Sequence, residues 1–516
     1  MNSPVPETPV LVVGAGPTGL MLALELVRHG ITPRIIDARS GPSPLSRALV
    51  VHARTLELLD RHGLAETFVQ QGLMVEGMNL RVWGRVVAHV PLGQIGASLS
   101  PFPYLLVISQ DQTERLLREA LEAQGIRVEW NTELTTLTVD TEPKSVSAQL
   151  NRGNEVQTAR FRFLVGCDGA HSATRKALQI RFPGGTYQQV FFVADTWVSG
   201  LAGNQGKKRY LQVAVQPQKF YAFFPMPDQR TRIIGILPEG VEPETATFED
   251  VRPMLEAAEK LKVEQVFWFS TYKVHHRVAD HFQQGPVFLA GDAAHVHSPA
   301  GGQGMNTGMG DAANLGWKLA AVLHRLAPSA LLNTYSTERI PFAQKLVATT
   351  DRAFSIVTRP ARLADIVRLR FLPLVLPALA RLPFIRKWAF RTVSQISIAY
   401  PDSPLSVGGA SNADAGERLP WQADGRFEAL RVTGWQLMAV GEPTQEVQEW
   451  ASQRELPFTV LRPMPGETPG TLYLLRPDGY LGLVAPQFEE VQFSAYADHW
   501  GIGKAPFRVL SAGRMN

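Results

Sequence analysis

The sequence of 516 residues contains a single cysteine, Cys167. One cysteine excludes an intramolecular disulfide, a CxxC redox pair, a cysteine-based zinc site and an iron–sulfur cluster. A strong charge of either sign is also missing, because 51 Lys and Arg residues face 47 Asp and Glu residues. The small excess of basic residues is not gathered in a Lys/Arg-rich run, so the charge does not indicate a nucleic-acid partner.

The sequence also lacks long apolar segments. The N-terminus, MNSPVPETPVLVV, has neither the charged region nor the long apolar region of a signal peptide. The most apolar later stretch, FLPLVLPALA at 371–380, contains prolines and is about half as long as a membrane span. The 45% hydrophobic and 19% charged residues exclude a disordered chain, a collagen-like repeat and a coiled coil. We therefore expect a cytoplasmic protein with no membrane span.

What is present begins with a βαβ pattern at the N-terminus. The apolar run Pro9–Val13 predicts a buried parallel strand, and Leu20–His29 predicts a helix. The following strand, Thr32–Ile36, ends on Asp37. A Gly-x-Gly-x-x-Gly turn separates the first strand from the helix, with Gly14, Gly16 and Gly19 enclosing Pro17 and Thr18.

Each glycine of this turn has a distinct physical task in a dinucleotide site. Gly14 permits a tight bend, Gly16 lets a pyrophosphate approach the backbone, and Gly19 allows close packing of helix on strand. The helix N-terminus offers free N–H groups to the phosphates, and Asp37 is placed to bind an adenosine ribose. The alternative is a purely structural tight turn. The complete pattern favours dinucleotide binding.

The pattern changes in the middle of the chain. Short alternating β segments from Gln179 to about Val278 predict an antiparallel domain inserted into the first. An amphipathic helix is expected over Asp311–Leu326 and a strand over Arg127–Asp140. The segment Pro401–Gly425 has the composition of a linker, so the residues after it could form a small α/β domain.

Two further motifs follow apolar strands. The segment Val165–Arg175 contains Asp168 and is equally consistent with a site residue and with a plain Asp-Gly turn and helix cap. The segment Leu289–His295 ends a strand on Asp292, a carboxylate able to bind a polyol hydroxyl. The glycines of Pro299–Asn306 let backbone contact a flat ring, and the next helix dipole would stabilise a reduced flavin. A glycine-rich packing loop is the alternative.

Together these motifs resemble the three fingerprints of single-component (class A) FAD-dependent aromatic monooxygenases, which have the para-hydroxybenzoate hydroxylase fold. The resemblance covers about residues 5–400. The segments Tyr400–Leu405 and Leu475–Tyr480 also resemble parts of the thioredoxin-like C-terminal domain of phenol and polyketide hydroxylases. The implied fold is α/β: a Rossmann-type FAD-binding domain, an inserted antiparallel-sheet substrate domain, a helical bridge and a thioredoxin-like domain.

The resemblance also implies domain limits and cofactor-binding residues. The FAD-binding domain is expected over 1–75, 104–178 and 280–355, the substrate domain over 76–103 and 179–279, the bridge over 356–400 and the C-terminal domain over 401–516. Arg47, alternatively a solvated surface arginine, is expected to reach the FAD phosphates, and Gln110 to lie near the flavin. The residues expected to bind FAD are Gly14, Gly16, Pro17, Thr18, Gly19, Asp37, Ala38, Arg39, Arg47, Gln110, Asp168, Gly291, Asp292, Pro299, Gly302, Gly304, Met305 and Asn306.

The implied reaction uses NAD(P)H and O₂ to hydroxylate a small phenolic or polyketide-type aromatic substrate through a C4a-hydroperoxyflavin. A homodimer is an expectation by analogy. Candidates for a catalytic base are Tyr221, His52, His295 and His297, although each residue type is more often packed or solvated. Alternatives are a flavoenzyme of the same fold that performs epoxidation, Baeyer–Villiger oxidation or reduction, and a non-catalytic flavin-binding protein.

Overall fold

The computed structural model describes residues 8–43, 46, 48–93, 95–140, 145–153, 155–201, 209–216, 219–358, 375, 379, 382–411, 413–463 and 465–503. Arg47 and the segments 359–374, 376–378 and 380–381 of the expected bridge lie outside these ranges. Within the described part of the bridge, α11 spans Pro383–Val393. No described helix is both long and apolar enough to cross a membrane.

The N-terminal strand lies inside a five-stranded sheet. Its order is β17 (Gln283–Gln284), β18 (Val287–Leu289), β11 (Phe163–Gly166), β1 (Val10–Val13) and β2 (Arg34–Ile36). Neighbouring strands from β18 to β2 run parallel, and only β17 is antiparallel. All four residues of β1 are buried, as expected for a strand covered on both faces. Helices α1 (Pro17–Arg28), α4 (Gln110–Ala123) and α7 (Gly304–Leu323) pack around this core.

The inserted domain is built on an eight-stranded sheet. The order is β19 (His295–Val296), β16 (Lys262–Val278), β12 (Gly184–Ser199), β15 (Thr231–Ile236), β14 (Lys219–Pro225), β13 (Tyr210–Gln216), β5 (Gly77–Val82) and β6 (Arg85–Pro91). All neighbours are antiparallel except β13 and β5. This parallel pair departs from a purely antiparallel sheet, because β5 comes from an earlier segment of the chain.

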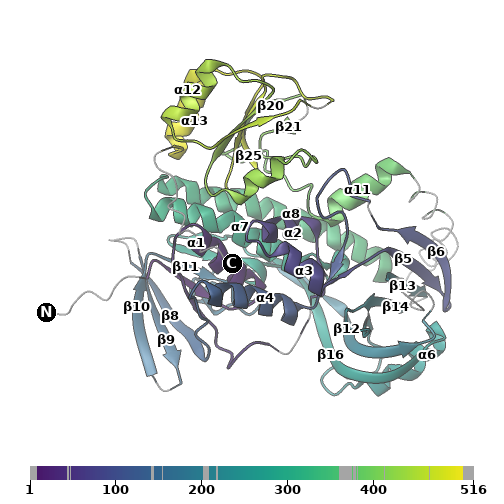
Figure 1. Ribbon diagram of the computed structural model, residues 1–516. Helices are drawn as coiled ribbons and strands as arrows, with labels where there is room; N and C mark the ends of the chain where they lie inside the picture. The colour runs from purple at the N-terminus through teal and green to yellow at the C-terminus, as the bar shows by residue number, and fades with distance from the viewer. Residues whose placement is uncertain are drawn as a thin grey trace.

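The two faces of this sheet have different neighbours. One face packs on α6 (Arg252–Glu259) and includes the buried Tyr221. The opposite face carries Phe220 and Tyr272 and contacts α8 (Asn333–Thr358). Adjacent residues of β14 point to opposite faces, which separates Phe220 from Tyr221. Figure 1 shows α6 on the side of this domain far from α8.

The C-terminal domain contains a mixed sheet flanked by two helices. Its strands follow the order β21 (Ala413–Asp414), β20 (Val407–Ala410), β25 (Leu481–Ala485), β24 (Leu472–Leu475), β22 (Gln436–Val440) and β23 (Phe458–Leu461). The helices are α12 (Gln445–Gln453) and α13 (Glu490–Trp500). This domain stands on α7 and α8 at the top of Figure 1.

Smaller elements complete the frame of the site. Helices α2 (Ala53–Asp60), α3 (Ala65–Gln71) and α5 (Ala173–Ala177) join the main core. Two three-stranded sheets also form, one with the order β10 (Glu155–Phe161), β9 (Ser145–Arg152) and β8 (Thr132–Asp140), the other with the order β3 (Val50–Val51), β7 (Leu106–Val107) and β4 (Leu73–Met74).

The largest differences between the expected and the observed boundaries are at the start of one helix and of one strand. The helix expected from Asp311 begins at Gly304, because the glycines before Asp311 are helical and let α7 pack closely on α1. A Cβ at Gly308 would lie 2.2 Å from Thr18 Oγ1, and one at Gly316 would lie 2.6 Å from Glu25 Cβ. The strand expected from Arg127 begins only at Thr132.

Candidate flavin site

The glycine turn between β1 and α1 has the form that a pyrophosphate requires. Gly14 has φ of +103°, and a Cβ there would lie 2.4 Å from the backbone oxygen of Cys167. A Cβ on Gly19 would lie 1.9 Å from the backbone oxygen of Gly14. A Cβ on Gly16 would meet nothing within 4 Å. Gly14 and Gly19 are therefore fixed by packing, whereas Gly16 exposes an open backbone face at the N-terminus of α1, which fits FAD.

Asp37 follows β2 and is tied to this turn. Its Oδ2 accepts from the Ala15 N–H at 2.8 Å, and its two oxygens accept from the Arg39 guanidinium at 2.9 Å. Burial alone would raise the pKa of Asp37, but the hydrogen bonds from Arg39 and Ala15 lower it below its ordinary value. The Arg39 side chain is 38% exposed and that of Asp37 is 9% exposed.

Gln110 extends the same polar surface. Its Oε1 accepts from the Ala48 N–H at 3.1 Å, and its Nε2 donates to Glu114 at 2.9 Å. Glu114 lies 4.0 Å from Arg39, which links Gln110 to the neighbourhood of Asp37. The structure thus brings Asp37, Arg39 and Gln110 together beside the glycine turn.

The Gly291–Asp292 turn lies directly against α1. Gly291 has φ of +61°, and a Cβ there would lie 2.5 Å from Thr18 Oγ1. The Gly291 N–H donates to Asp311 Oδ2 at 2.9 Å, and Asp292 is exposed at the turn. Two motifs almost 300 residues apart in the sequence therefore meet where the ribityl chain of FAD is expected.

A cluster of buried polar side chains, formed by Asp311, His295 and Arg339, holds the Gly291–Asp292 turn in place. Asp311 also accepts from His295 Nε2 at 2.8 Å and from Arg339 Nε at 2.6 Å. Burial alone would raise the pKa of Asp311, but Arg339 and His295 lower it to about 2. His295, a candidate base, is thus bound to a buried carboxylate. Asp311 and Arg339 were not expected from the sequence, although Asp311 is an acidic residue on the apolar face of a predicted helix.

Asn306 connects the glycine-rich loop to α2. Its Nδ2 donates to the backbone oxygens of Val50 and Gly302, and its Oδ1 accepts from the His52 N–H and Thr55 Oγ1, over 2.7–2.9 Å. The hydrogen-bonding capacity of this amide is therefore filled within the protein. Gly302 has φ of +64°, with Val50 at 3.0 Å from the position of a Cβ. Backbone atoms of this loop, rather than the Asn306 amide, are left to face a ring.

The remaining residues expected to bind FAD lie in the Asp168 turn, in the first turns of α1 and α7 and beside Asp37. Both oxygens of Asp168 accept hydrogen bonds within its own turn, from Ser172 Oγ at 2.6 Å and from the Thr174 N–H and hydroxyl at 3.0 Å. Pro17 occupies the first turn of α1, and Pro299 is exposed before Gly304 and Met305, the first residues of α7. Ala38 lies between Asp37 and Arg39.

The histidine and tyrosine candidates are not gathered at one point. His52 Nε2 bonds to the Gly301 backbone oxygen at 2.9 Å, and burial lowers the pKa of His52 to about 4. His297 Nδ1 bonds to the Ser298 backbone oxygen at 2.8 Å, and burial with the nearby His295 lowers the pKa of His297 to about 4. Tyr221 lies on the far face of the inserted sheet, in the core against α6. The three histidines lie near the glycine-rich loop Pro299–Asn306, and Tyr221 does not.

The neutral state of His52 predicts a loss of stability in mild acid. An unfolded histidine titrates near pH 6.5, so the unfolded chain gains a proton before folded His52 does. The stabilisation is complete above pH 6.5 and is lost as the pH falls towards 4, by about 3 kcal/mol for this group. We expect the free energy of unfolding of His52→Gln, measured with urea, to decrease by about 3 kcal/mol less than that of the wild type as the pH falls from 6.5 towards 4. Parallel pH curves would contradict the assignment.

The fold and the site define a class of flavin-dependent oxidoreductase, and comparison with known proteins agrees. A family model described as "FAD binding domain" matches residues 7–350, so the chain belongs to this family of FAD-binding proteins. It is 32% identical over 510 residues to 6-methylpretetramide 4-monooxygenase of Streptomyces rimosus, covering 92% of this chain and 90% of the relative. Pentachlorophenol 4-monooxygenase of Sphingobium chlorophenolicum is 30% identical, with 87% and 83% covered.

A solved structure extends the agreement to nearly the full length of the chain. The anhydrotetracycline hydroxylase of Streptomyces rimosus superposes with a TM-score of 0.77 at 30% identity, covering 96% of this chain and 99% of that one. These comparisons confirm the expected family and fold class. The protein is an FAD-dependent aromatic monooxygenase that uses NAD(P)H as co-substrate.

Proposed function

We propose that the protein hydroxylates a phenolic substrate, of the polycyclic polyketide type, bound on the α8-facing side of the inserted sheet. The observation that carries this proposal is a half-buried aromatic and aliphatic surface at that position. Phe191 and Val274 are buried there, and around them lie Tyr187, Phe220, Ile234, Ile236 and Tyr272, all only partly covered. A flat apolar ligand gains free energy by covering such a surface.

The location of this surface supports the assignment. Tyr187 on the sheet donates a short hydrogen bond to Asp351 on α8. The residue before it, Thr350, offers its backbone oxygen to Ser298 Oγ at 3.4 Å. Ser298 directly precedes the glycine-rich loop, so the hydrogen bonds of Asp351 and Thr350 connect the apolar surface to this loop. The relatives named for aromatic compounds, including 6-methylpretetramide and pentachlorophenol, favour the same substrate class.

Bound FAD, reduced by NAD(P)H, supplies the activation of O₂ and the oxygen transfer in this proposal. The protein contributes binding, orientation and exclusion of water. The apolar surface holds the ring system, and the Asp351 carboxylate accepts a hydrogen bond from a substrate hydroxyl and takes up its proton. Burial and Asp351 together raise the pKa of Tyr187, so its hydroxyl stays protonated and holds Asp351 in place. The FAD contacts expected above, including Asp37 and the Gly291–Asp292 turn, are part of the proposal.

Asp351→Asn tests the role of this carboxylate. The amide keeps the shape but cannot accept a proton, so we expect kcat to fall by about 100-fold or more. Tyr187→Phe removes only the orienting bond, and we expect about a fivefold decrease in kcat/KM. Asp498→Asn, at an exposed Arg454 pair in the C-terminal domain, is the control. Wild-type kcat in Asp351→Asn would show that the carboxylate takes no proton.

The function itself is tested by NADPH consumption with and without aromatic ligands. Anhydrotetracycline, 6-methylpretetramide and pentachlorophenol serve as probes, and mass spectrometry detects a product that carries one added oxygen atom. We expect faster NADPH oxidation coupled to product. Oxidation that yields only hydrogen peroxide with every probe would favour reduction or another same-fold chemistry over aromatic hydroxylation.

The proposal includes the expected domain limits, a cytoplasmic location and a homodimer. Hydrophobic cores within the N-terminal, inserted and C-terminal parts support the domain limits given above. A further core joins the C-terminal part to Trp317, Ala321 and Leu331 of the N-terminal part. A cytoplasmic location is supported by the use of NAD(P)H. A homodimer, carried over from the family, is tested by light scattering of the purified holoenzyme.

A further inference from the structure

The C-terminal domain inserts one turn into the flavin-binding domain. This turn, Arg476–Tyr480, joins β24 to β25, and Arg476 is fully buried. Arg476 donates to both oxygens of Glu338 on α8, at 2.7 and 3.0 Å. The domain has no cysteine, so disulfide chemistry is excluded as the reason for this insertion. The buried contacts instead indicate that the turn holds parts of the flavin-binding domain in position.

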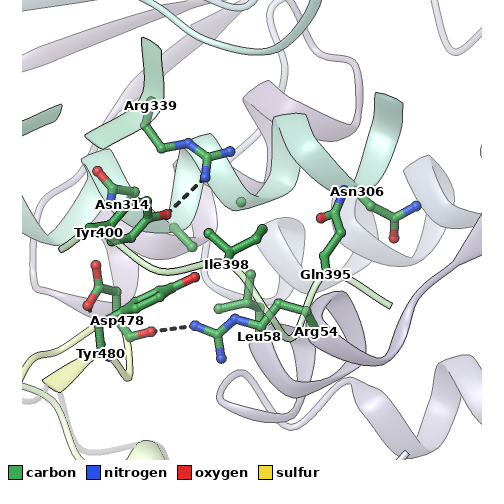
Figure 2. Close-up of a pocket in the computed structure, with 12 residues that line it drawn as sticks. Arg54, Leu58, Asn306, Asn314, Arg339, Gln395, Ile398, Tyr400, Asp478 and Tyr480 are labelled. Carbon is green, nitrogen blue, oxygen red and sulfur yellow. Dashed lines mark hydrogen bonds between the residues drawn. The ribbon is translucent and has the colours of Figure 1, made fainter. Parts of the chain in front are cut away.

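One path, made of a ring contact followed by hydrogen bonds, leads from this turn to the expected flavin site. Tyr480 packs on Tyr400 with ring centroids 4.6 Å apart. The Tyr400 hydroxyl accepts from Arg339 Nη1 at 2.9 Å, as Figure 2 shows. Arg339 in turn donates to Asp311, which accepts from the Gly291 N–H. The backbone of the Gly291–Asp292 turn is therefore connected to Tyr480 of the C-terminal domain through one ring contact and three hydrogen bonds.

A second path reaches the glycine-rich loop through α2. Arg54 Nη2 donates to the backbone oxygen of Asp478 at 2.8 Å, the other dashed contact in Figure 2. The next residue of α2, Thr55, donates to Asn306 Oδ1 at 2.7 Å. Both paths border one small cavity, lined among others by Arg54, Asn306, Arg339 and Tyr400. The C-terminal turn is thus connected to two of the backbone segments expected to contact FAD, the Gly291–Asp292 turn and the glycine-rich loop.

We propose that the C-terminal domain positions the FAD-binding backbone, with Tyr400 and Arg339 as the positioning residues that transmit the contact to Gly291. Neither side chain touches the reacting atoms. Arg339 holds Asp311 in the orientation that fixes the Gly291 N–H, and Tyr400 holds Arg339. Loss of this restraint loosens the turn and weakens FAD binding while the fold persists. This inference rests on FAD binding alone and is independent of the proposed substrate.

Tyr400→Phe and Tyr496→Phe form a matched pair that tests the proposal. Each removes one buried tyrosine hydroxyl, and that of Tyr496 donates to the Leu405 backbone oxygen at 2.7 Å, a bond that belongs to neither path. We expect similar decreases in the melting temperature of the apoprotein. Only Tyr400→Phe should raise the Kd for FAD, by about fivefold for one lost hydrogen bond, and shift the flavin reduction potential.

Two outcomes overturn the proposal: an FAD Kd and potential unchanged in Tyr400→Phe, or an equal rise in Tyr496→Phe. Should Tyr400→Phe not fold, Arg339→Lys provides the second test, because it keeps a positive charge beside Asp311 and loses the bond to Tyr400. We expect the same rise in FAD Kd, and a wild-type Kd would overturn the inference. Neither readout requires substrate turnover, so failure of the proposed substrate class leaves the test intact.

Discussion

Gly14→Ala is expected to yield a protein that no longer retains FAD. The new Cβ would lie 2.4 Å from the backbone oxygen of Cys167 at the end of β11, a neighbouring strand that cannot rotate away. The positive φ costs about 1–2 kcal/mol for a residue with a side chain. The clash adds about 1–3 kcal/mol and moves the turn away from β11. If about 3 kcal/mol of FAD binding is lost, the Kd rises about 100-fold.

The flavin absorbance of the purified protein and titration of the apoprotein with FAD measure this effect. Gly125→Ala is the matched control, because Gly125 has φ of +80° and a Cβ there meets nothing within 4 Å. It shares the backbone strain without the clash. We expect Gly125→Ala to bind FAD normally. A yellow Gly14→Ala protein with wild-type FAD affinity would contradict the role of this turn.

The N-terminal βαβ unit could be predicted because its signals are local. The apolar strand, the spacing of Gly14, Gly16 and Gly19, and the acid at Asp37 all lie within one short segment. The structure adds the reason for Gly14 and Gly19, because a Cβ on either would collide with the backbone of Cys167 or of Gly14 itself. The resemblance to aromatic hydroxylases then implied the family and the fold class, which the comparisons confirm.

The residues behind the site could not be predicted in the same way. Asp311, Arg339 and Tyr400 come from separate helices and from the chain that enters the C-terminal domain, so no spacing in the sequence connects them. The exclusion of Tyr221 from the flavin side depends on which face of the inserted sheet α6 covers. A strand pattern assigns residues to two faces but does not say which face meets the flavin-binding domain.

Glu338→Gln is expected to destabilise the protein strongly, because Glu338 is the centre of a second buried cluster, which it forms with Arg476 and Lys318. Its carboxylate accepts from Arg476 at 2.7 and 3.0 Å and from Lys318 Nζ at 2.8 Å, and all three side chains are fully buried. Removing one partner of a buried ion pair leaves an uncompensated charge, at a cost of about 3–5 kcal/mol. We expect that loss in the free energy of unfolding measured with urea at pH 7.

Glu119→Gln is the control on the surface. Glu119 pairs with Arg115 at 2.8 Å, the same distance as Lys318 to Glu338, but the two side chains are 49% and 35% exposed. Exposed pairs of this kind contribute about 1 kcal/mol or less. A loss of that size in Glu338→Gln would contradict the importance of the buried cluster.

The charge balance of the cluster predicts a partial rescue. Burial lowers the pKa of Lys318 to about 8 even though Glu338 lies beside it and raises that pKa. Without Glu338 the ammonium loses the carboxylate that contacts it and remains close to Arg476. Adding Lys318→Met to Glu338→Gln removes this buried cation, and we expect about 1–2 kcal/mol of stability to return, within the range of coupling between contacting residues. Additive losses in the double variant would instead show that packing, rather than charge, dominates where the two domains meet.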